Sequence, residues 1–270
     1  MSNLRIDSHL VNIGLARSRG HAADLVKAHR VFIGERELTK PSQLVDTEAQ
    51  ITVVAADEYV SRAGLKLKGA LDKFAEIDVV GKCALDVGAS TGGFTDVLLR
   101  HGASRVVAID VGHDQLAPEL LTNPRVLSFE GINAREVTMN ELRELTGIVD
   151  LEFQLVVADL SFISVTLVLP ALVKVAPTAD FVLLIKPQFE VGKQSLSASG
   201  IVSDHRLRAQ AIKQVVDCCN ELGLGVLGLE RSELPGTHGN IEYLIWVASS
   251  ERPNQSKWTE RIEKLAREGK

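Results

Sequence analysis

A strand, a glycine-rich loop, a helix and a second strand follow one another within one short segment. The apolar run of residues 83–87 contains Asp86 and passes into a loop of small residues, Gly88-Ala89-Ser90-Thr91-Gly92-Gly93. A helical pattern follows, and the next apolar run, residues 105–109, ends in Asp110. In a βαβ unit such a loop lets the backbone approach a nucleotide, and a carboxylate after the second strand accepts hydrogen bonds from ribose hydroxyls. The segment therefore predicts a nucleotide site on a parallel sheet.

The loop favours one class of nucleotide. Ser90 stands where the dinucleotide fingerprint G-x-G-x-x-G has its second glycine, so a pyrophosphate has no clear seat at the helix N-terminus. S-adenosylmethionine has a ribose and an adenine but no phosphate, and we expect this cofactor. A dinucleotide site, or glycines that serve packing alone, are the alternatives. The residues expected to contact the cofactor are Asp86, Gly88, Ser90, Gly92, Gly93, Asp110, Asn133 and Asp159.

Length, charge and cysteine usage narrow the class of protein. A chain of 270 residues is long enough for one large and one small domain, and 45% hydrophobic residues suit a globular core. The net charge of −5 argues against general coating of nucleic acid, so any RNA must meet a local basic patch. Three cysteines without metal-ligand spacing indicate no metal and a reducing compartment. No signal-peptide core and no apolar run of ~20 residues is present, which predicts a cytoplasmic protein with no membrane partner.

Residues 1–55 differ in character from the rest of the chain. Two short amphipathic helices and several short strands are expected there. Residues 1–34 carry two aspartates against five basic residues, which are Arg5, Arg17, Arg19, Lys27 and Arg30. Such a cluster suits phosphates and RNA shape, although a solvated charged face is an equally good interpretation of the charges alone.

A resemblance favours the RNA interpretation. The segments Arg5-Ile6-Asp7, Leu10-Val11, Gly14-Leu15-Ala16-Arg17-Ser18-Arg19 and Ala22-Ala23-Asp24-Leu25-Val26 resemble the alpha-L RNA-binding module. That module occurs in a small-subunit ribosomal protein, pseudouridine synthases and tyrosyl-tRNA synthetases. The resemblance implies that residues 1–55 bind RNA through the five basic residues. Residues 56–60 then form a linker to a second domain, residues 61–270.

The second domain reads as a doubly wound α/β sheet. Seven apolar runs are expected to be strands, with helical patterns between the first five of them: 83–87, 105–109, 126–129, 154–158, 181–185, 226–229 and 242–248. This alternation predicts a seven-stranded, mostly parallel sheet of Rossmann-like type. Sites in such sheets lie at the carboxyl ends of the strands.

Two charged residues stand at such strand ends. Asp159 ends the fourth run, and Lys186 ends the fifth, directly before Pro187. Burial lowers the pKa of a lysine, and a second lysine nearby lowers it further, so Lys186 could act as a base. The alternatives are that Asp159 caps the following turn and that Lys186 extends to solvent. Lys66 and Glu242 would each pass for surface charges if taken alone.

Taken together, these four residues resemble the Lys-Asp-Lys-Glu tetrad of FtsJ-like RNA ribose 2′-O-methyltransferases. The phrases Tyr59-Val60-Ser61-Arg62-Ala63-Gly64-Leu65-Lys66-Leu67, Ala158-Asp159-Leu160-Ser161-Phe162-Ile163-Ser164 and Lys186-Pro187-Gln188-Phe189-Glu190-Val191-Gly192 extend the likeness. With the RNA module in front, the whole chain resembles the TlyA family of rRNA 2′-O-methyltransferases, also called haemolysin A.

The TlyA resemblance implies an S-adenosylmethionine-dependent enzyme that methylates ribosomal RNA within a ribosomal subunit. It also implies that Lys66, Asp159, Lys186 and Glu242 are the catalytic residues. Two other functions stay open from the sequence. A membrane-active haemolysin would need a lipid-binding element, and a ribosome-assembly factor could bind cofactor and RNA without turnover.

Overall fold

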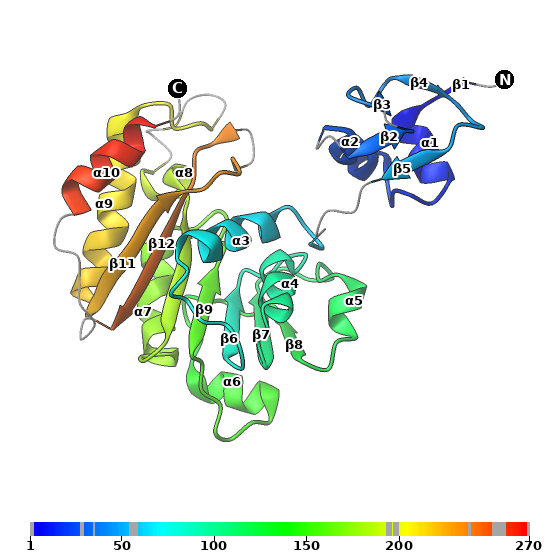
Figure 1. The fold of residues 1–270 in the computed structure, drawn as a ribbon. Coiled ribbons are helices and arrows are strands. Elements are labelled where there is room, and N and C mark those ends of the chain that lie inside the picture. The colour runs from blue at the N-terminus through cyan, green and yellow to red at the C-terminus, as the bar shows by residue number, and fades with distance from the viewer. Residues whose placement is uncertain are drawn as a thin grey trace. The chain divides into compact units, whose positions relative to one another are not determined.

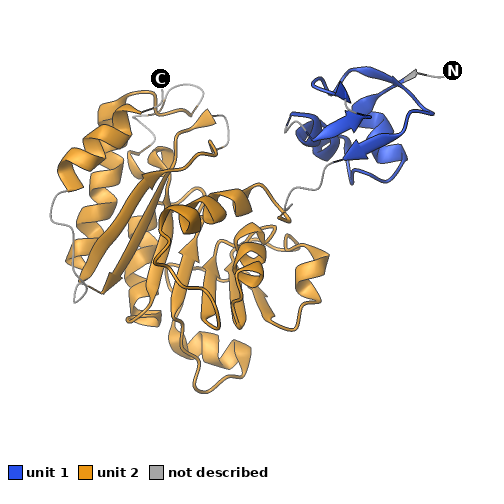
Figure 2. Ribbon diagram, viewed as in Figure 1, with its two compact units in different colours: residues 1–58 blue, residues 59–270 orange. Residues whose placement is uncertain are grey.

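The computed structural model describes residues 3–27, 30–34, 36–53, 59–192, 196, 200–236, 239–249 and 258–268. The chain divides into two compact units, residues 1–58 and 59–270 (Figure 2). Of the expected linker 56–60, the first three residues lie outside the described ranges. The other two, Tyr59 and Val60, are buried in the core of the second unit, so they belong to that unit.

The first unit is a small α+β fold. Two helices pack with short antiparallel strands that form the sheets β1-β4 and β3-β2-β5. Ile6, Leu10, Ala22 and Val26 are fully buried at helical spacing, and they make the core of this unit. The elements are β1 (Asn3–Arg5), α1 (Ile6–Asn12), α2 (Arg19–Lys27), β2 (Val31–Ile33), β3 (Arg36–Glu37), β4 (Leu44–Asp46) and β5 (Ile51–Val53).

The second unit contains the expected seven-stranded sheet, in the order β11-β12-β10-β9-β6-β7-β8 (Figure 1). Strands β8, β7, β6, β9 and β10 are parallel, whereas β12 is antiparallel to both of its neighbours. The prediction of a mostly parallel α/β sheet is therefore confirmed. The strands are β6 (Cys83–Val87), β7 (Arg105–Asp110), β8 (Val126–Glu130), β9 (Leu155–Ala158), β10 (Asp180–Ile185), β11 (Leu224–Arg231) and β12 (Tyr243–Ser249).

Helices cover both faces of this sheet. One apolar cluster joins one face to α6, α7, α9 and α10, and a second cluster joins the other face to α3, α4 and α5. Side chains that alternate along each strand supply both clusters, as Ala84 and Leu85 of β6 do. The helices are α3 (Ala63–Lys73), α4 (Gly93–Arg100), α5 (Pro118–Leu121), α6 (Met139–Thr146), α7 (Val165–Val175), α8 (Pro187–Glu190), α9 (His205–Glu221) and α10 (Trp258–Arg267).

The strand order reverses between β6 and β9, and this reversal positions the site. The chain leaves β6 towards β7 on one side and leaves β9 towards β10 on the other. The connections that follow β6 and β9 thus diverge at the carboxyl ends of neighbouring parallel strands, where doubly wound sheets bind their ligands. Gly88 follows β6 and Asp159 follows β9, and a Cβ atom on Gly88 would lie 3.0 Å from the backbone oxygen of Asp159.

Candidate active site

The loop after β6 is held to the end of β7 by one carboxylate. Gly88 and Gly92 adopt positive φ angles of 78° and 93°, which a residue with a side chain rarely accepts. Asp110 accepts the backbone N–H of Ser90 at 2.8 Å through one oxygen and the N–H of Gly112 at 2.7 Å through the other. Each carboxylate oxygen can accept a further hydrogen bond. Asp110 is therefore fixed in place and retains acceptors for a pair of hydroxyls.

Packing explains two of the loop glycines. A Cβ atom on Gly92 would overlap Leu120 of α5, and one on Gly93 would overlap the Ser61 hydroxyl and lie 2.7 Å from the backbone nitrogen of Gly64. These glycines let α4 approach its neighbouring helices closely. The alternative function raised from the sequence, packing, therefore accounts for Gly92 and Gly93, and their contact with a nucleotide stays a prediction.

Asp86 lies beneath the loop with no exposed surface. The Thr95 hydroxyl donates to one of its oxygens at 2.6 Å, and the other oxygen has no hydrogen-bond partner among the described residues. Burial raises the pKa of Asp86 to about 7, although the Thr95 hydroxyl opposes that rise. Asp86 thus supports the loop from within the sheet and carries one unsatisfied acceptor.

Four charged side chains meet beside this loop, although 176 residues separate the first from the last. Lys66 on α3 contacts Glu242 at 2.7 Å and Asp159 at 3.6 Å. Lys186, at the end of β10, contacts the other oxygen of Asp159 at 2.6 Å. Cations and anions alternate in the order Glu242, Lys66, Asp159, Lys186. The structure thus brings together all four residues that the sequence singled out.

The four side chains are largely withdrawn from water, which decides between the interpretations of Asp159 and Lys186. Their side-chain exposed fractions range from 2% for Glu242 to 13% for Asp159. Lys186, at 9%, does not extend to solvent. The helix after β9 is capped by Ser164 rather than Asp159. Both structural alternatives for these residues are therefore wrong.

Three residues at the site were missed as individual sites by the sequence reasoning. Lys186 donates to the Ser161 hydroxyl at 2.9 Å and lies 5.8 Å from the ring centre of Phe189. The ring of Phe162 lies 5.5 Å from that of Phe189, yet Phe162 is 93% exposed and has a positive φ of 67°. An exposed aromatic ring that packs on Phe189, itself next to Lys186, offers a stacking surface for a planar group such as a base. The signal available in the sequence was Phe162, an aromatic residue a few positions after the end of β9.

The other expected residues lie in two places. Asn133, after β8, is exposed, and its side-chain oxygen accepts the backbone N–H of Arg135. In the first unit, Arg5 and Arg19 contact the buried carboxylate of Asp7 at 2.6 and 3.4 Å. The Arg5 guanidinium holds the pKa of Asp7 well below its usual range. Arg17 and Lys27 are exposed on the same unit, and Arg30 is partly buried.

The described residues include no group of three or more His, Cys, Asp or Glu side chains arranged to hold a metal ion. Among the same residues, every helix is too short or too polar to cross a membrane.

Comparisons with known proteins agree with this geometry. Residues 59–249 match the model of the FtsJ-like methyltransferase family, and residues 4–51 match the S4 domain. A Mycobacterium tuberculosis protein named 16S/23S rRNA (cytidine-2′-O)-methyltransferase TlyA is 49% identical over 246 residues, which are 90% of this chain and 89% of the relative. The chain belongs to the TlyA family of FtsJ-like methyltransferases.

Other members of the TlyA family carry a different name. A Brachyspira hyodysenteriae protein named Hemolysin A is 39% identical and covers 89% of this chain and 98% of its own length. The solved structure of a protein described as a hemolysin from Streptococcus thermophilus has a TM-score of 0.73 and 33% identity. It covers 98% of this chain and 95% of that protein. The TlyA fold, with its N-terminal S4 domain, therefore extends over essentially the whole chain.

Proposed function

We propose that this chain transfers a methyl group from S-adenosylmethionine to a ribose 2′-hydroxyl of ribosomal RNA. The observation that carries the proposal is the alternating set Glu242, Lys66, Asp159 and Lys186 beside the loop after β6. Family membership supports methyl transfer, and the S4 domain supports an RNA substrate. The Mycobacterium tuberculosis relative's name specifies cytidine in 16S and 23S rRNA, so we propose the same nucleotide and RNAs for this chain.

The residues of the loop fit the cofactor. Asp110 has spare acceptors on both oxygens for two ribose hydroxyls. The loop N-terminal to α4 has no second fingerprint glycine and instead has Ser90, whose hydroxyl donates to Gln115 at 2.9 Å. When bound, S-adenosylmethionine supplies a methyl group already activated by its sulfonium. Asn133, exposed after β8, is proposed to border the adenine.

Lys186 is the proposed base. In its neutral form its Nζ accepts the 2′-hydroxyl proton as the ribose oxygen takes the methyl group. Asp159 and the Ser161 hydroxyl fix the position of Nζ from two sides. Lys66, held by Glu242 and Asp159, places a positive charge near the developing charge on the oxygen. The chain's residues thus provide orientation, a proton acceptor and electrostatic stabilisation.

Two substitutions test the function by separating cofactor binding from proton transfer. Lys186→Arg keeps a positive charge, but arginine does not deprotonate at working pH because its pKa lies above ~12. We expect this variant to bind S-adenosylmethionine and rRNA normally and to lose about 10²–10⁴-fold in single-turnover methyl transfer. Asp110→Ala should show the opposite pattern, with weakened cofactor binding in isothermal titration.

Lys68→Arg is a matched control, since Lys68 lies on α3 and pairs with the exposed Asp72. It should behave as the wild type. Methylation is best mapped as 2′-O-methyl nucleotides in rRNA from cells with and without the gene. Normal transfer by Lys186→Arg would remove Lys186 as the base. If the rRNA of both strains carried the same 2′-O-methylation, the proposed function would be rejected. An assembly factor without turnover would then be favoured.

A further inference from the structure

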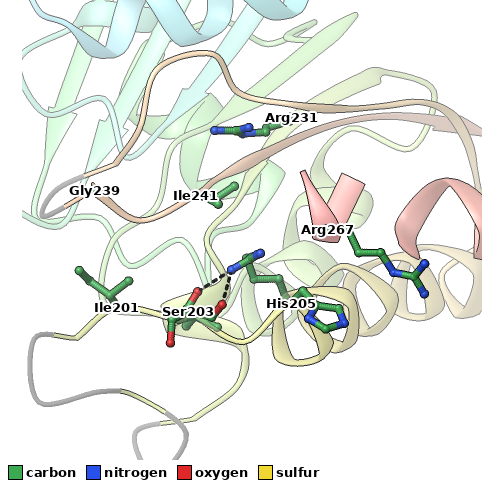
Figure 3. A pocket seen from close by; sticks show the side chains of 9 residues that line it. Ile201, Ser203, His205, Arg231, Gly239, Ile241 and Arg267 are labelled. Atoms are coloured by element: carbon green, nitrogen blue, oxygen red, sulfur yellow. Dashed lines mark hydrogen bonds between the residues drawn. The ribbon is translucent and has the colours of Figure 1, made fainter. Parts of the chain in front are cut away.

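A pocket lies in the methyltransferase unit, outside the four-residue site. It has a volume of about 700 Å³ and is bordered by the end of β11, the segment before α9 and the end of α10 (Figure 3). Arg231 projects from the β11 side, and Ser203 and His205 lie on the opposite side (Figure 3). The pocket is also lined by Arg208 and Arg267. Among the described residues that line it there is no carboxylate, although Arg267 pairs with Glu263 and His205 lies 3.7 Å from Asp204, both outside the lining.

Arg208 brings a buried positive charge to this pocket. Only 5% of the residue is exposed, and its guanidinium donates to the backbone oxygens of Val202, Ser203 and Ala266 at 2.7–3.2 Å. Carbonyl oxygens satisfy its donors but do not neutralise its charge. Within the described part of the chain, no carboxylate forms an ion pair with it. A buried cation without a counter-ion is costly, and an anion in the pocket would offset that cost.

Two neighbouring groups bear on the charge of this pocket. Among the described residues, no ion pair or hydrogen bond involves the Arg231 guanidinium. Burial raises the pKa of the Tyr243 hydroxyl. Arg208, through its charge and as a hydrogen-bond donor, and Arg231, through its charge, oppose that rise, so both arginines lie near this hydroxyl. Glu268 also lies near enough to raise that pKa, but no ion pair joins it to either arginine.

The register of three strands places this pocket at the same sheet edge as the four-residue site. Arg231 of β11 pairs with Tyr243 of β12, and Tyr243 pairs with Ile185 of β10. Ile185 directly precedes Lys186. Neighbouring strands lie about 4.8 Å apart, so two strand spacings, roughly 10 Å, separate the backbones of Arg231 and Ile185. Glu242 of the site directly follows Ile241 of the pocket wall.

We propose that this pocket, lined by Arg208, Arg231 and His205, binds a backbone phosphate of the substrate RNA next to the methylated nucleotide. The inference rests on the proposed function, because it assumes an RNA strand at the four-residue site. Arginine is suited to phosphate because its planar donors match two phosphate oxygens. The register sets a separation of about two strand spacings along the sheet between Arg231 and the residue before Lys186, and the proposal requires an adjoining phosphate of the RNA to cover that separation. The contact fixes the position of the RNA without reading its sequence.

Arg231→Gln is the decisive variant, since Arg231 is only partly buried and Arg208 ties α9 to α10. We expect it to raise both the Kd of rRNA and the KM in single-turnover methylation about tenfold, the effect of one lost charge-assisted hydrogen bond. The salt dependence of binding should become shallower by about one unit of slope. The methylation rate at saturating RNA and the S-adenosylmethionine affinity should stay as in the wild type. Arg231→Lys should recover part of the loss.

Arg206→Gln is the matched control, because Arg206 is an exposed arginine one residue beyond His205 that does not line the pocket. It should leave Kd, KM and the salt slope unchanged. Unchanged values for Arg231→Gln would overturn the proposal, and so would a lower saturating rate at unchanged KM, which would mark a structural role. Thermal unfolding of Arg231→Gln at the wild-type temperature shows that the variant is folded.

Two further measurements distinguish an RNA phosphate from a free phosphate or nucleotide in the pocket. They also distinguish failure of the pocket proposal from failure of the proposed methyltransferase function. Inorganic phosphate and cytidine monophosphate are titrated into the wild type and Arg231→Gln. Free-nucleotide binding that is lost in Arg231→Gln while its rRNA affinity is kept would assign the pocket to a free nucleotide and reject the RNA contact. If the wild type bound rRNA but did not methylate it, the proposed function would fail. The rRNA affinity of Arg231→Gln, compared with that of the wild type, would still test the phosphate contact in the pocket.

Discussion

Buried carboxylates in the second unit differ in what balances their charge. Glu242 has the Lys66 ammonium at 2.7 Å. Asp180 accepts from the indole of Trp246 and lies 3.5 Å from Lys82. Among the described residues, Asp86 has neutral hydrogen-bond partners only, both from Thr95, and it lies below the loop after β6. This difference explains why burial raises the pKa of Asp86 to about 7.

The pKa of Asp86 predicts how stability depends on pH. Between its ordinary value near 4 and about 7, folded Asp86 keeps a proton that the unfolded chain has released. This group therefore favours the folded state most below pH 4 and progressively less as pH rises to 7, by about 4 kcal/mol at most. Asp86→Asn should flatten the fall in unfolding free energy between pH 5 and 8, measured by denaturant titration without cofactor.

Asp150→Asn provides the comparison, because Asp150 is exposed. That variant should keep the wild-type slope. An equally steep slope in Asp86→Asn would mean that another group produces the pH dependence.

Single residues were predictable from the sequence where a strong local pattern surrounded them. Lys186 was found because five apolar residues precede it and Pro187 follows. No such pattern surrounds Ser161 or Gly236. Ser161 matters through its contact with Lys186, and Gly236 through its close approach to the Glu242 side chain, and neither contact can be seen in the local sequence. Lys66 and Glu242 could be selected only through resemblance, because each is an unremarkable charge in its own segment.

At the scale of elements, the connection between β11 and β12 is shaped around Glu242. The backbone N–H of Ser232 donates to the backbone oxygen of Glu242 at 2.9 Å, and the backbone N–H of Gly236 donates to the backbone oxygen of Asn240 at 2.9 Å. A Cβ atom on Gly236 would lie 2.6 Å from the carboxyl carbon of Glu242. The absence of a side chain at Gly236 therefore lets this connection fold closely over the carboxylate that holds Lys66.

Gly236→Ala should displace the Glu242 carboxylate without removing any charge. A shift of about 1 Å in an active-site group can cost about 10²-fold in rate. We expect a fall of about 10–10²-fold in the methylation rate at saturating RNA, with cofactor affinity unchanged, measured in single-turnover assays. Gly69→Ala is the control, because a Cβ atom there meets no other group within 4 Å. Full activity in Gly236→Ala would show that Glu242 needs no fixed position.

The elements were predictable in proportion to their length. The seven strands of the large sheet were located because each contains three or more apolar residues in a short run bounded by polar segments. The antiparallel direction of β12 was not specified by its pattern, which is equally apolar in either direction. Strands β1 and β4 were missed, since three residues are too few to show alternation.

At the scale of the whole molecule, the acidic net charge of −5 coexists with a basic stretch at residues 1–34 of the first unit, which carries five Lys or Arg against two Asp. Charge reversal there should weaken RNA binding while leaving the loop after β6 unaffected. We expect Arg17→Glu with Lys27→Glu to raise the Kd of rRNA and to lower the slope of its salt dependence by about two. Filter binding at several salt concentrations measures both, and isothermal titration should give an unchanged S-adenosylmethionine affinity.

Lys174→Glu in the second unit is a matched control, since Lys174 is exposed on α7. Its salt slope should equal that of the wild type. An unaltered salt slope in the double variant would show that Arg17 and Lys27 do not contact RNA phosphates. It would contradict the proposed RNA-binding role of these two residues.

The joining of Lys66 to Glu242 across 176 residues has a consequence for the timing of activity during synthesis. The loop after β6 and strand β7 are synthesised well before Glu242 and β12. A growing chain therefore lacks the Lys66–Glu242 pair until Glu242 has been added, and the proposed four-residue site cannot form on a shorter chain.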